Sequence, residues 1–334
     1  MKMPCFECLE KRKTSLLLAL LAILLVIPLF VEKSYIMGVF CRIFMYAILA
    51  GSLNVINGYS NQFNLGHVGF FCVGAYVEAI LSTTYHVNFW LLLPFAGICA
   101  ALSALLVVLP TLKLQGMYLS IVTMGFSEIL RLIALNWNTV TGGPDGIKGI
   151  ASPLLFGIKI SKSGQFYYLF LLVLVLFLFF TNRVLKSRLG RAWIAIREDQ
   201  LAARSLGVEI STYKAINFMY GAFWAGLAGA IYAPYFRFIS SDMFNLDESF
   251  NILSMAIIGG LGTLAGPVFG SAIVSILSEV LRPVSQYRML VYAALIIVVM
   301  WIRPQGLYGD SASILAGNSI HLFKKKKSSR AREA

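Results

Sequence analysis

Few residues in this chain carry groups that could do chemistry, and they form no known catalytic pattern. The three histidines stand at positions 67, 86 and 321, and the HExxH and GxSxG patterns of zinc proteases and serine hydrolases are absent. The chain has no GxxxxGK(S/T) phosphate-binding loop, so it cannot hydrolyse ATP by itself. Cys5 and Cys8 form a single CxxC pair, whereas a four-ligand metal site usually needs two such pairs. We therefore expect no catalytic residue, no metal and no cofactor bound by this chain.

Charged side chains inside strongly apolar stretches are the remaining candidates, because a charge in hydrocarbon is costly enough to suggest a function. Glu128 and Arg131 are three residues apart, so on a helix they share a face and can pair. They could meet the ammonium and carboxylate of a zwitterion, or form a structural ion pair between helices, which is the interpretation we favour. Glu78 has no evident partner in the sequence. Arg42, near the outer end of its stretch, is expected to snorkel.

These residues need elements to position them, and the composition indicates which kind. The 334 residues are 58% hydrophobic and 13% charged, about half the roughly 25% charge of a soluble domain. The composition excludes a soluble enzyme, a disordered chain and a nucleic-acid binder. Because a spanning helix needs about 20 mostly apolar residues, we predict an all-α polytopic membrane protein with about ten transmembrane helices. The predicted spans are residues 15–31, 35–56, 67–84, 89–112, 116–135, 166–182, 215–235, 249–265, 267–283 and 288–302.

Basic residues set the predicted orientation of these spans. The net charge is +13, and basic residues of membrane proteins gather on the cytoplasmic side. Ten spans with the N-terminus inside place most of the 28 Lys and Arg residues on that side. We predict a cytoplasmic N-terminal arm over residues 1–15, a transmembrane domain over 16–309, and a basic cytoplasmic tail over 310–334. The tail can touch anionic lipid headgroups.

Two stretches are too polar or too rich in glycine to be plain spanning helices. Residues 57–70 are too polar to face lipid, and irregular backbone at membrane depth survives only when it is buried in protein or lines a wet cavity. Residues 258–270 combine glycines at four-residue spacing with Pro267, which predicts close helix packing and a helix that starts at the proline. We interpret both as broken or re-entrant segments beside a translocation path, with an ordinary interfacial loop as the alternative for the first and a packing role favoured for its histidine. The path candidates are Asn64, Gly66, His67, Glu128, Gly259, Gly260 and Gly262.

The third informative stretch is the long basic loop over residues 183–214. Glu198 and Asp199 suit the N-terminus of a helix, and Arg204 followed by Gly207 suits its C-terminus and cap. The pattern predicts a short, stiff cytoplasmic helix with small residues on one face, which the groove of a partner protein could receive. A surface helix packed on its own protein is the alternative. The residues of this predicted coupling element are Arg197, Glu198, Asp199, Ala202, Ala203 and Gly207.

In their order and spacing, five motifs between residues 35 and 309 resemble the permeases of ATP-binding-cassette importers for branched-chain amino acids, specifically the LivM-type subunits. Residues 202–207 are similar to the EAAxxxG coupling loop of such permeases, with Leu201 where that pattern has Glu. The other matching stretches are residues 64–70 followed by 74–76, 141–147, 259–263 and 303–307.

The resemblance implies a type II importer permease in the bacterial inner membrane, with both termini in the cytoplasm. It implies as partners a second, LivH-type permease, two ATP-binding-cassette ATPases that hydrolyse ATP with Mg²⁺, and an extracytoplasmic amino-acid-binding protein, but no nucleic acid. By the same analogy the helix near residues 197–207 sits in an ATPase groove, and the outer loop 136–165 faces the binding protein. The docking candidates in that loop are Thr141, Gly142, Gly143 and Asp145.

The resemblance leaves the cargo and the energy source open to alternatives. The expected cargo is a branched-chain or related hydrophobic amino acid, with urea or short amides as the alternative. An ion-coupled carrier is the competing mechanism, since Glu78 and Glu128 could serve as carboxylates near the midplane. A membrane enzyme or scaffold, the third class, would show no substrate flux.

Overall fold

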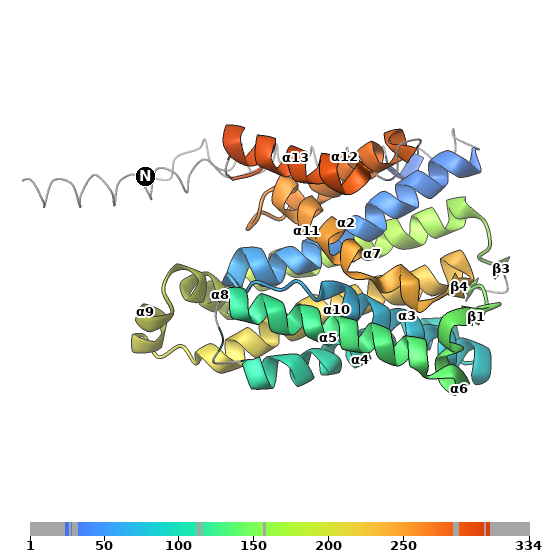
Figure 1. Cartoon of the computed structure of the whole chain (residues 1–334), viewed down its shortest axis with the longest axis horizontal. Coiled ribbons are helices and arrows are strands. Elements are labelled where there is room, and N and C mark those ends of the chain that lie inside the picture. Colours follow the sequence, from blue (N-terminus) through green and yellow to red (C-terminus); the bar gives the residue numbers. More distant parts are fainter. Residues whose placement is uncertain are drawn as a thin grey trace, which may run out of the picture.

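The computed structural model describes residues 24–26, 28, 33–111, 114, 116–155, 158–282, 287–303 and 305–307. Most of its helices lie side by side along the long axis of the molecule (Figure 1). The helices are α2 (Ser34–Ser60), α3 (His67–Thr84), α4 (Phe89–Thr111), α5 (Met117–Asn136), α6 (Asn138–Thr141), α7 (Ser163–Leu185), α8 (Arg188–Glu198), α9 (Gln200–Ser205), α10 (Ile210–Phe236), α11 (Leu246–Gly259), α12 (Gly266–Val280) and α13 (Arg288–Ile302). Between them lie two 3-10 helices, η1 (Gly143–Asp145) and η2 (Ser241–Phe244), and four short strands, β1 (Ile147–Lys148), β2 (Leu154–Leu155), β3 (Ile158–Lys159) and β4 (Phe238–Ile239).

The apolar stretches of the sequence form the long helices that the composition predicts. Five of them, α2, α3, α4, α5 and α7, are long and apolar enough to cross a membrane. Helix α3 begins and ends at the predicted residues, 67 and 84. Helix α10 has 27 residues, which is also long enough for a crossing. The predicted all-α class is confirmed, apart from the four two-residue strands.

Helices α11 and α12 are shorter than the predicted spans, whereas α13 has the predicted bounds, 288–302. Helices α11, α12 and α13 have 14, 15 and 15 residues, whereas a full crossing needs about 20. The predicted span 249–265 ends at Gly259 because Gly260 and Gly262 have φ angles of +116° and +78°, which interrupt a right-handed helix. The first predicted span, 15–31, lies mostly outside the described residues, and the arm 1–15 and the tail 310–334 lie wholly outside them. The count of ten spans therefore stays a prediction.

Helix α10 packs closely against α3 and α4 because glycines let the backbones approach. A Cβ atom added at Gly74 of α3 would lie 2.2 Å from the carbonyl oxygen of Gly226 in α10. One added at Gly226 would lie 2.5 Å from the Cβ of Ala100 in α4. These contacts join three helices that lie far apart in the sequence into one tightly packed group.

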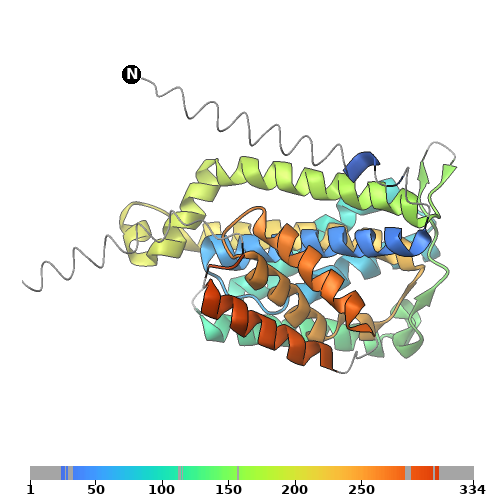
Figure 2. The ribbon, with the colours of Figure 1, turned by 90° about the horizontal axis from the view of Figure 1, so that it is seen from above.

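Helix α2 is buried along most of its length and packs against α7, α10 and α12. Seen from above, α7 and α13 lie at opposite edges of the molecule, with α2, α11 and α12 between them (Figure 2). Helices α8 and α9 project at one end of the molecule, whereas α6 and the paired strands β1 and β4 lie at the other (Figure 1). The two loops that the sequence singles out, 183–214 and 136–165, are thus at opposite ends.

Candidate functional site

The turn between α11 and α12, residues 260–265, which we call the glycine hinge, is tied to the last turns of α2. The buried Asn54 side chain accepts a hydrogen bond from the Gly262 N–H at 2.8 Å and donates one to the Thr263 carbonyl oxygen at 2.7 Å. Gly58, one turn further along α2, lies so close that an added Cβ would be 2.4 Å from the Gly262 nitrogen. The hinge is therefore held in place by α2 through specific contacts.

The predicted close packing around the hinge is confirmed for the glycines on both sides of it. An added Cβ at Gly259 would lie 2.0 Å from the Gly266 carbonyl oxygen, and one at Gly270 would lie 1.9 Å from the Met255 carbonyl oxygen. Helix α12 begins at Gly266 with Pro267 in its first turn, as the sequence predicts. Two of the path candidates, Gly260 and Gly262, supply the positive φ angles of the turn itself.

The polar segment after α2 is a hydrogen-bonded connection in which Gln62, Asn64 and Gly66 are buried. Asn57 and Asn64 bond each other, with the Asn64 N–H donating to Oδ1 of Asn57 at 3.1 Å and Nδ2 of Asn57 donating to the Asn64 carbonyl oxygen at 3.3 Å. Nε2 of the buried His67 ring lies 2.7 Å from Oγ of Ser52, and its Nδ1 lies 3.4 Å from Nδ2 of Asn64. Since both ring nitrogens contact protein groups, the structure favours a packing role for this histidine.

Helix α5 packs against this segment, and α10 packs against the end of α2 that precedes it. Gly66 packs on α5, where an added Cβ would lie 1.9 Å from the Thr123 carbonyl oxygen. Asn217 of α10, which is fully buried, accepts a hydrogen bond from Oγ of Ser60 at 2.9 Å and donates one to the Val55 carbonyl oxygen at 3.1 Å. Between α2 and α3, Gln62, Asn64 and Gly66 are buried, whereas Asn61 and Phe63 are exposed. The path-lining and interfacial-loop interpretations of residues 57–70 therefore both stay predictions.

The charged residues within the helices do not converge on one point. Arg131 Nε donates to both carboxylate oxygens of Glu128 at 3.0 Å, which is the predicted pair, and its Nη1 lies 3.9 Å from Oδ1 of Asp242 in η2. Glu78 of α3 is completely buried, and within the described part of the chain neither of its carboxyl oxygens has a hydrogen-bond partner. No hydrogen bond among the described residues joins Glu128 to the glycine hinge or to the His67 network.

The predicted coupling element consists of two short helices. Asp199 breaks the chain between α8 and α9 and caps α9, with its Oδ1 accepting from the N–H groups of Leu201 at 2.7 Å and Ala202 at 3.0 Å. Glu198 therefore ends α8 and does not start the coupling helix. Gly207 follows α9 with a φ of +82°, as the predicted cap requires.

The two alanines of α9 do not share an exposed face. Ala203 is 2% exposed and packs inward, whereas Ala202 lies on the surface. Leu201 and Leu206 are 76% and 83% exposed. On the inner side of the loop, the fully buried Trp193 of α8 donates its indole N–H to the Tyr213 carbonyl oxygen at 3.0 Å. The loop is thus anchored by α8 and presents leucines at α9.

The predicted docking loop at the opposite end is a compact turn. Thr141 is buried, and its hydroxyl donates to the Ala134 carbonyl oxygen at 2.7 Å. Gly142 and Gly143 have positive φ angles of +74° and +55°, which build the turn around this hydroxyl. Asp145 is the docking candidate that lies on the surface.

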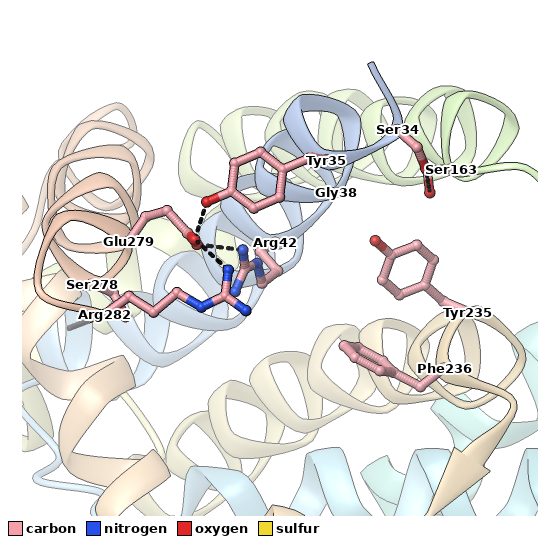
Figure 3. A pocket seen from close by; sticks show the side chains of 10 residues that line it. All are labelled: Ser34, Tyr35, Gly38, Arg42, Ser163, Tyr235, Phe236, Ser278, Glu279 and Arg282. Carbon is pink, nitrogen blue, oxygen red and sulfur yellow. Dashed lines mark hydrogen bonds and ion pairs between the residues drawn. The ribbon is translucent and has the colours of Figure 1, made fainter. Parts of the chain in front are cut away.

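A cavity of about 380 Å³ lies at the same end as the docking loop, among the ends of α2, α7, α10 and α12 (Figure 3). Nη2 of Arg42 donates to Oε2 of Glu279 at 2.5 Å, a partner not predicted from the sequence, and its predicted snorkelling stays a prediction. Tyr35 donates to the same carboxylate, and Nη1 of Arg282 lies 3.5 Å from its Oε1. Figure 3 shows the three side chains meeting on the Glu279 carboxylate, which fastens α2 to α12.

Sequence reasoning missed several of these residues for identifiable reasons. Asn54 and Asn217 are single amides in apolar helices, and nothing in their spacing shows what they contact. Glu279 could have been found from the sequence, because it is a carboxylate within an apolar stretch. Arg42 lies within a second apolar stretch and could have been considered as its partner. Among the described residues, no group of three or more His, Cys, Asp or Glu side chains could hold a metal ion.

Comparisons with known proteins agree with this architecture. A family model described as the permease component of branched-chain amino acid transport systems matches residues 35–300. The chain is 35% identical to the high-affinity branched-chain amino acid transport system permease protein LivM of Escherichia coli K12, over 91% of this chain and 77% of LivM. It is 25% identical to the LivH permease of the same organism, over 79% of this chain and 91% of LivH, and 26% identical to the autoinducer 2 import permease LsrC of Yersinia pestis, over 51% of this chain and 48% of LsrC. No solved structure matches the chain significantly.

Proposed function

The chain belongs to the family of permease components of branched-chain amino acid transport systems, and from this premise we propose that it is one of two membrane subunits of an ATP-driven importer. The second subunit is a LivH-type permease, a proposal supported by the similarity of this chain to LivH itself. Two ATP-binding-cassette ATPases supply the energy, and an extracytoplasmic binding protein delivers the amino acid. The complex lies in the bacterial inner membrane, with both termini of this chain in the cytoplasm.

The observation that carries this proposal is the exposed helix α9 at one end of a helical membrane protein. Leu201 and Leu206 leave most of their side-chain surface uncovered there, and burying apolar surface in a partner's groove is favourable by about 25 cal/mol per Å². The compact turn that holds Asp145 lies at the opposite end, where an extracytoplasmic protein would dock. An importer needs this arrangement, because its ATPases bind at one end of the permease and its binding protein docks at the other.

A branched-chain amino acid is the cargo that the similarity to LivM supports best. The name of LsrC assigns it to autoinducer 2 import, so relatives of this chain differ in cargo, and urea or a short amide is the second candidate. An ion-coupled carrier is less well supported, because the Glu128 carboxylate is engaged by Arg131. Glu78 is the carboxylate on which a carrier mechanism would depend.

The test is uptake of radiolabelled leucine into proteoliposomes that hold this chain, the sister permease and both ATPases, with the binding protein added outside. We expect uptake only when ATP, the ATPases and the binding protein are all present. Uptake by this chain alone under a proton or sodium gradient would instead support the carrier. Competition by urea or acetamide, but not by isoleucine or valine, would assign the second cargo.

The contact with the ATPases has its own test. We expect the double variant Leu201→Ser, Leu206→Ser to lose co-purification of the ATPases, because it removes the apolar surface presented by α9. Ile194→Ser is the matched control, since Ile194 is also exposed, at 42%, but lies on α8. Equal loss in both variants would contradict a docking role for α9.

A further inference from the structure

Helix α8, which is part of the coupling loop, contacts the glycine hinge through the side chain of Arg197. Arg197 stands in the last turn of α8, and its Nη1 donates a hydrogen bond to the Gly58 carbonyl oxygen at 2.8 Å, across 139 residues of sequence. Gly58 lies in the last turn of α2, where carbonyl groups lack partners within the helix. A cation at this end is also stabilised by the helix dipole. The guanidinium therefore acts as a cap on α2 that is supplied by the loop.

The same guanidinium lies directly against the hinge. A Cβ atom added at Gly262 would be 2.5 Å from Nη1 of Arg197 and 3.5 Å from its Cζ. The position consequently needs glycine for two reasons, its φ of +78° and the space that Arg197 occupies. Asn54 holds the same turn from the α2 side, through its bonds to Gly262 and Thr263. Three elements thus meet at one point: the coupling loop, the end of α2 and the hinge.

The other polar contacts of α8 do not reach the hinge. The guanidinium of Arg191 donates to the Lys186 carbonyl oxygen at 3.0 Å, which lies in the same loop. Trp193 donates to the Tyr213 carbonyl oxygen at the start of α10. Among the described hydrogen bonds, the one from Arg197 to Gly58 connects the loop with the end of α2 that lies beside the glycine hinge. Because Arg197 is two residues before the cap Asp199, a movement of α9 reaches it through a short piece of chain.

We propose that Arg197 is a positioning residue that transmits the movement of the α8–α9 loop to the glycine hinge between α11 and α12, and so couples the ATPases to the opening of the permease. The proposal rests on the proposed function, and it assigns Arg197 to contact with the glycine hinge instead of to the ATPase surface. It requires that loss of the side chain leave the ATPases bound while separating ATP hydrolysis from transport.

The experiment compares Arg197→Ala with Arg191→Ala in the complete reconstituted complex. Arg191 is the matched control because it is the same residue type on the same helix, and its guanidinium also binds a carbonyl oxygen. The measured quantities are the amount of ATPase that co-purifies, the rate of ATP hydrolysis and the number of leucine molecules taken up per ATP. We expect Arg197→Ala to keep its ATPases and to lower the leucine-to-ATP ratio about tenfold, an effect within the range seen for single residues in coupling networks.

A second variant, Gly262→Ala, alters the contact between Arg197 and the hinge from the hinge side. Gly262→Ala places a methyl group where the guanidinium lies, so it should displace Arg197 and lower the ratio as well. If the two residues act through one contact, the double variant Arg197→Ala, Gly262→Ala has a ratio close to that of the lower single variant, because effects of contacting residues do not add.

Three results would overturn the proposal. The first is a wild-type ratio in Arg197→Ala, the second an equal fall in Arg191→Ala, and the third a loss of the ATPases from the Arg197→Ala complex. Full additivity in the double variant would separate Gly262 from Arg197 and also count against the contact. Absence of ATP-dependent uptake by the unaltered complex is a different outcome, since it would refute the proposed function itself, on which the role of Arg197 depends.

Discussion

At the scale of single residues, the buried amides of Asn54 and Asn217 and the carboxylate of Glu279 join helices that lie far apart in the sequence. Asn54 binds both an N–H and a carbonyl group of the glycine hinge, whereas Asn217 of α10 binds the Ser60 hydroxyl and the Val55 carbonyl group of α2. Buried polar groups of this kind are costly when one partner is lost. At the hinge, the Asn54 side chain substitutes for backbone hydrogen bonds that an interrupted helix cannot make.

The first prediction concerns Asn54. Asn54→Ala removes the partners of the Gly262 N–H and the Thr263 carbonyl, and leaving such groups unsatisfied should lower the stability by about 2 kcal/mol. Thermal unfolding of the purified chain in detergent measures the change. Asn136→Ala is the control, because Asn136 is exposed and, within the described part of the chain, its side chain bonds the Leu132 carbonyl oxygen of its own helix. Similar midpoints for the two variants would show that the hinge does not depend on Asn54.

At the scale of elements, the positions of glycines decide where helices end and how closely they pack. Gly207 ends the coupling element in a conformation with a φ of +82°. Gly266 and Gly270 bring α12 onto α11 with almost no space between the backbones. The two groups of glycines serve different purposes, since one supplies backbone freedom and the other supplies room.

The second prediction concerns the cap of α9. Proline fixes φ near −65° and cannot adopt the conformation of Gly207, so Gly207→Pro should abolish leucine uptake while the protein stays in the membrane. Gly207→Asn is the control, because asparagine tolerates left-handed backbone and should retain most of the uptake. A substitution of the buried Ala203 by Phe should also abolish uptake, through overpacking. Wild-type transport in Gly207→Pro would place the coupling element elsewhere.

The third prediction concerns the packing of α12. A leucine at Gly266 would collide with Thr263 and the Gly260 carbonyl oxygen, since even a Cβ would lie 2.4 Å from Oγ1 of Thr263. We therefore expect Gly266→Leu to lower the yield and the unfolding temperature of the complex. Gly164→Leu serves for comparison, because nothing lies within 4 Å of a Cβ at Gly164. An unfolding temperature equal to that of the wild type would contradict the close approach.

At the scale of the whole molecule, α2 and α12 are fastened to each other near both ends. The Arg42–Glu279 pair lies at the end that holds the docking loop, and the bonds from Asn54 to the hinge lie towards the coupling loop. Two helices joined in this way are suited to move as one body, which is a common form of transporter motion. A push on the hinge would then reach the cavity lined by Tyr35 and Glu279.

The fourth prediction tests which partner meets each end. A cysteine at the exposed Ala202 should crosslink to an ATPase, and a cysteine at the exposed Asp145 should crosslink to the binding protein. The reagent, its length and the complex are the same in both cases, so each variant controls for the other. Failure of Ala202→Cys to reach an ATPase in any nucleotide state would refute the arrangement, as would exchanged partners.

The sequence alone determines the membrane class, most helices and several of the places where helices break. Apolar composition and length suffice for this, because a helix in hydrocarbon satisfies its own backbone, and glycine, proline and polar runs interrupt it locally. The prediction of the cap at Gly207 and of the start of α12 at Pro267 depended on such local rules.

Only the tertiary structure decides which side chains meet across the molecule. The sequence does not show that Arg197 lies on Gly58 and Gly262, that Arg42 binds Glu279, or that Ala203 faces inward while Ala202 does not. These contacts depend on how helices with nearly uniform apolar faces are rotated and packed. When every face of a helix is apolar, the spacing of apolar residues does not show which face packs inward. The rotation of each helix about its axis is then set by close packing and by a few buried polar partners.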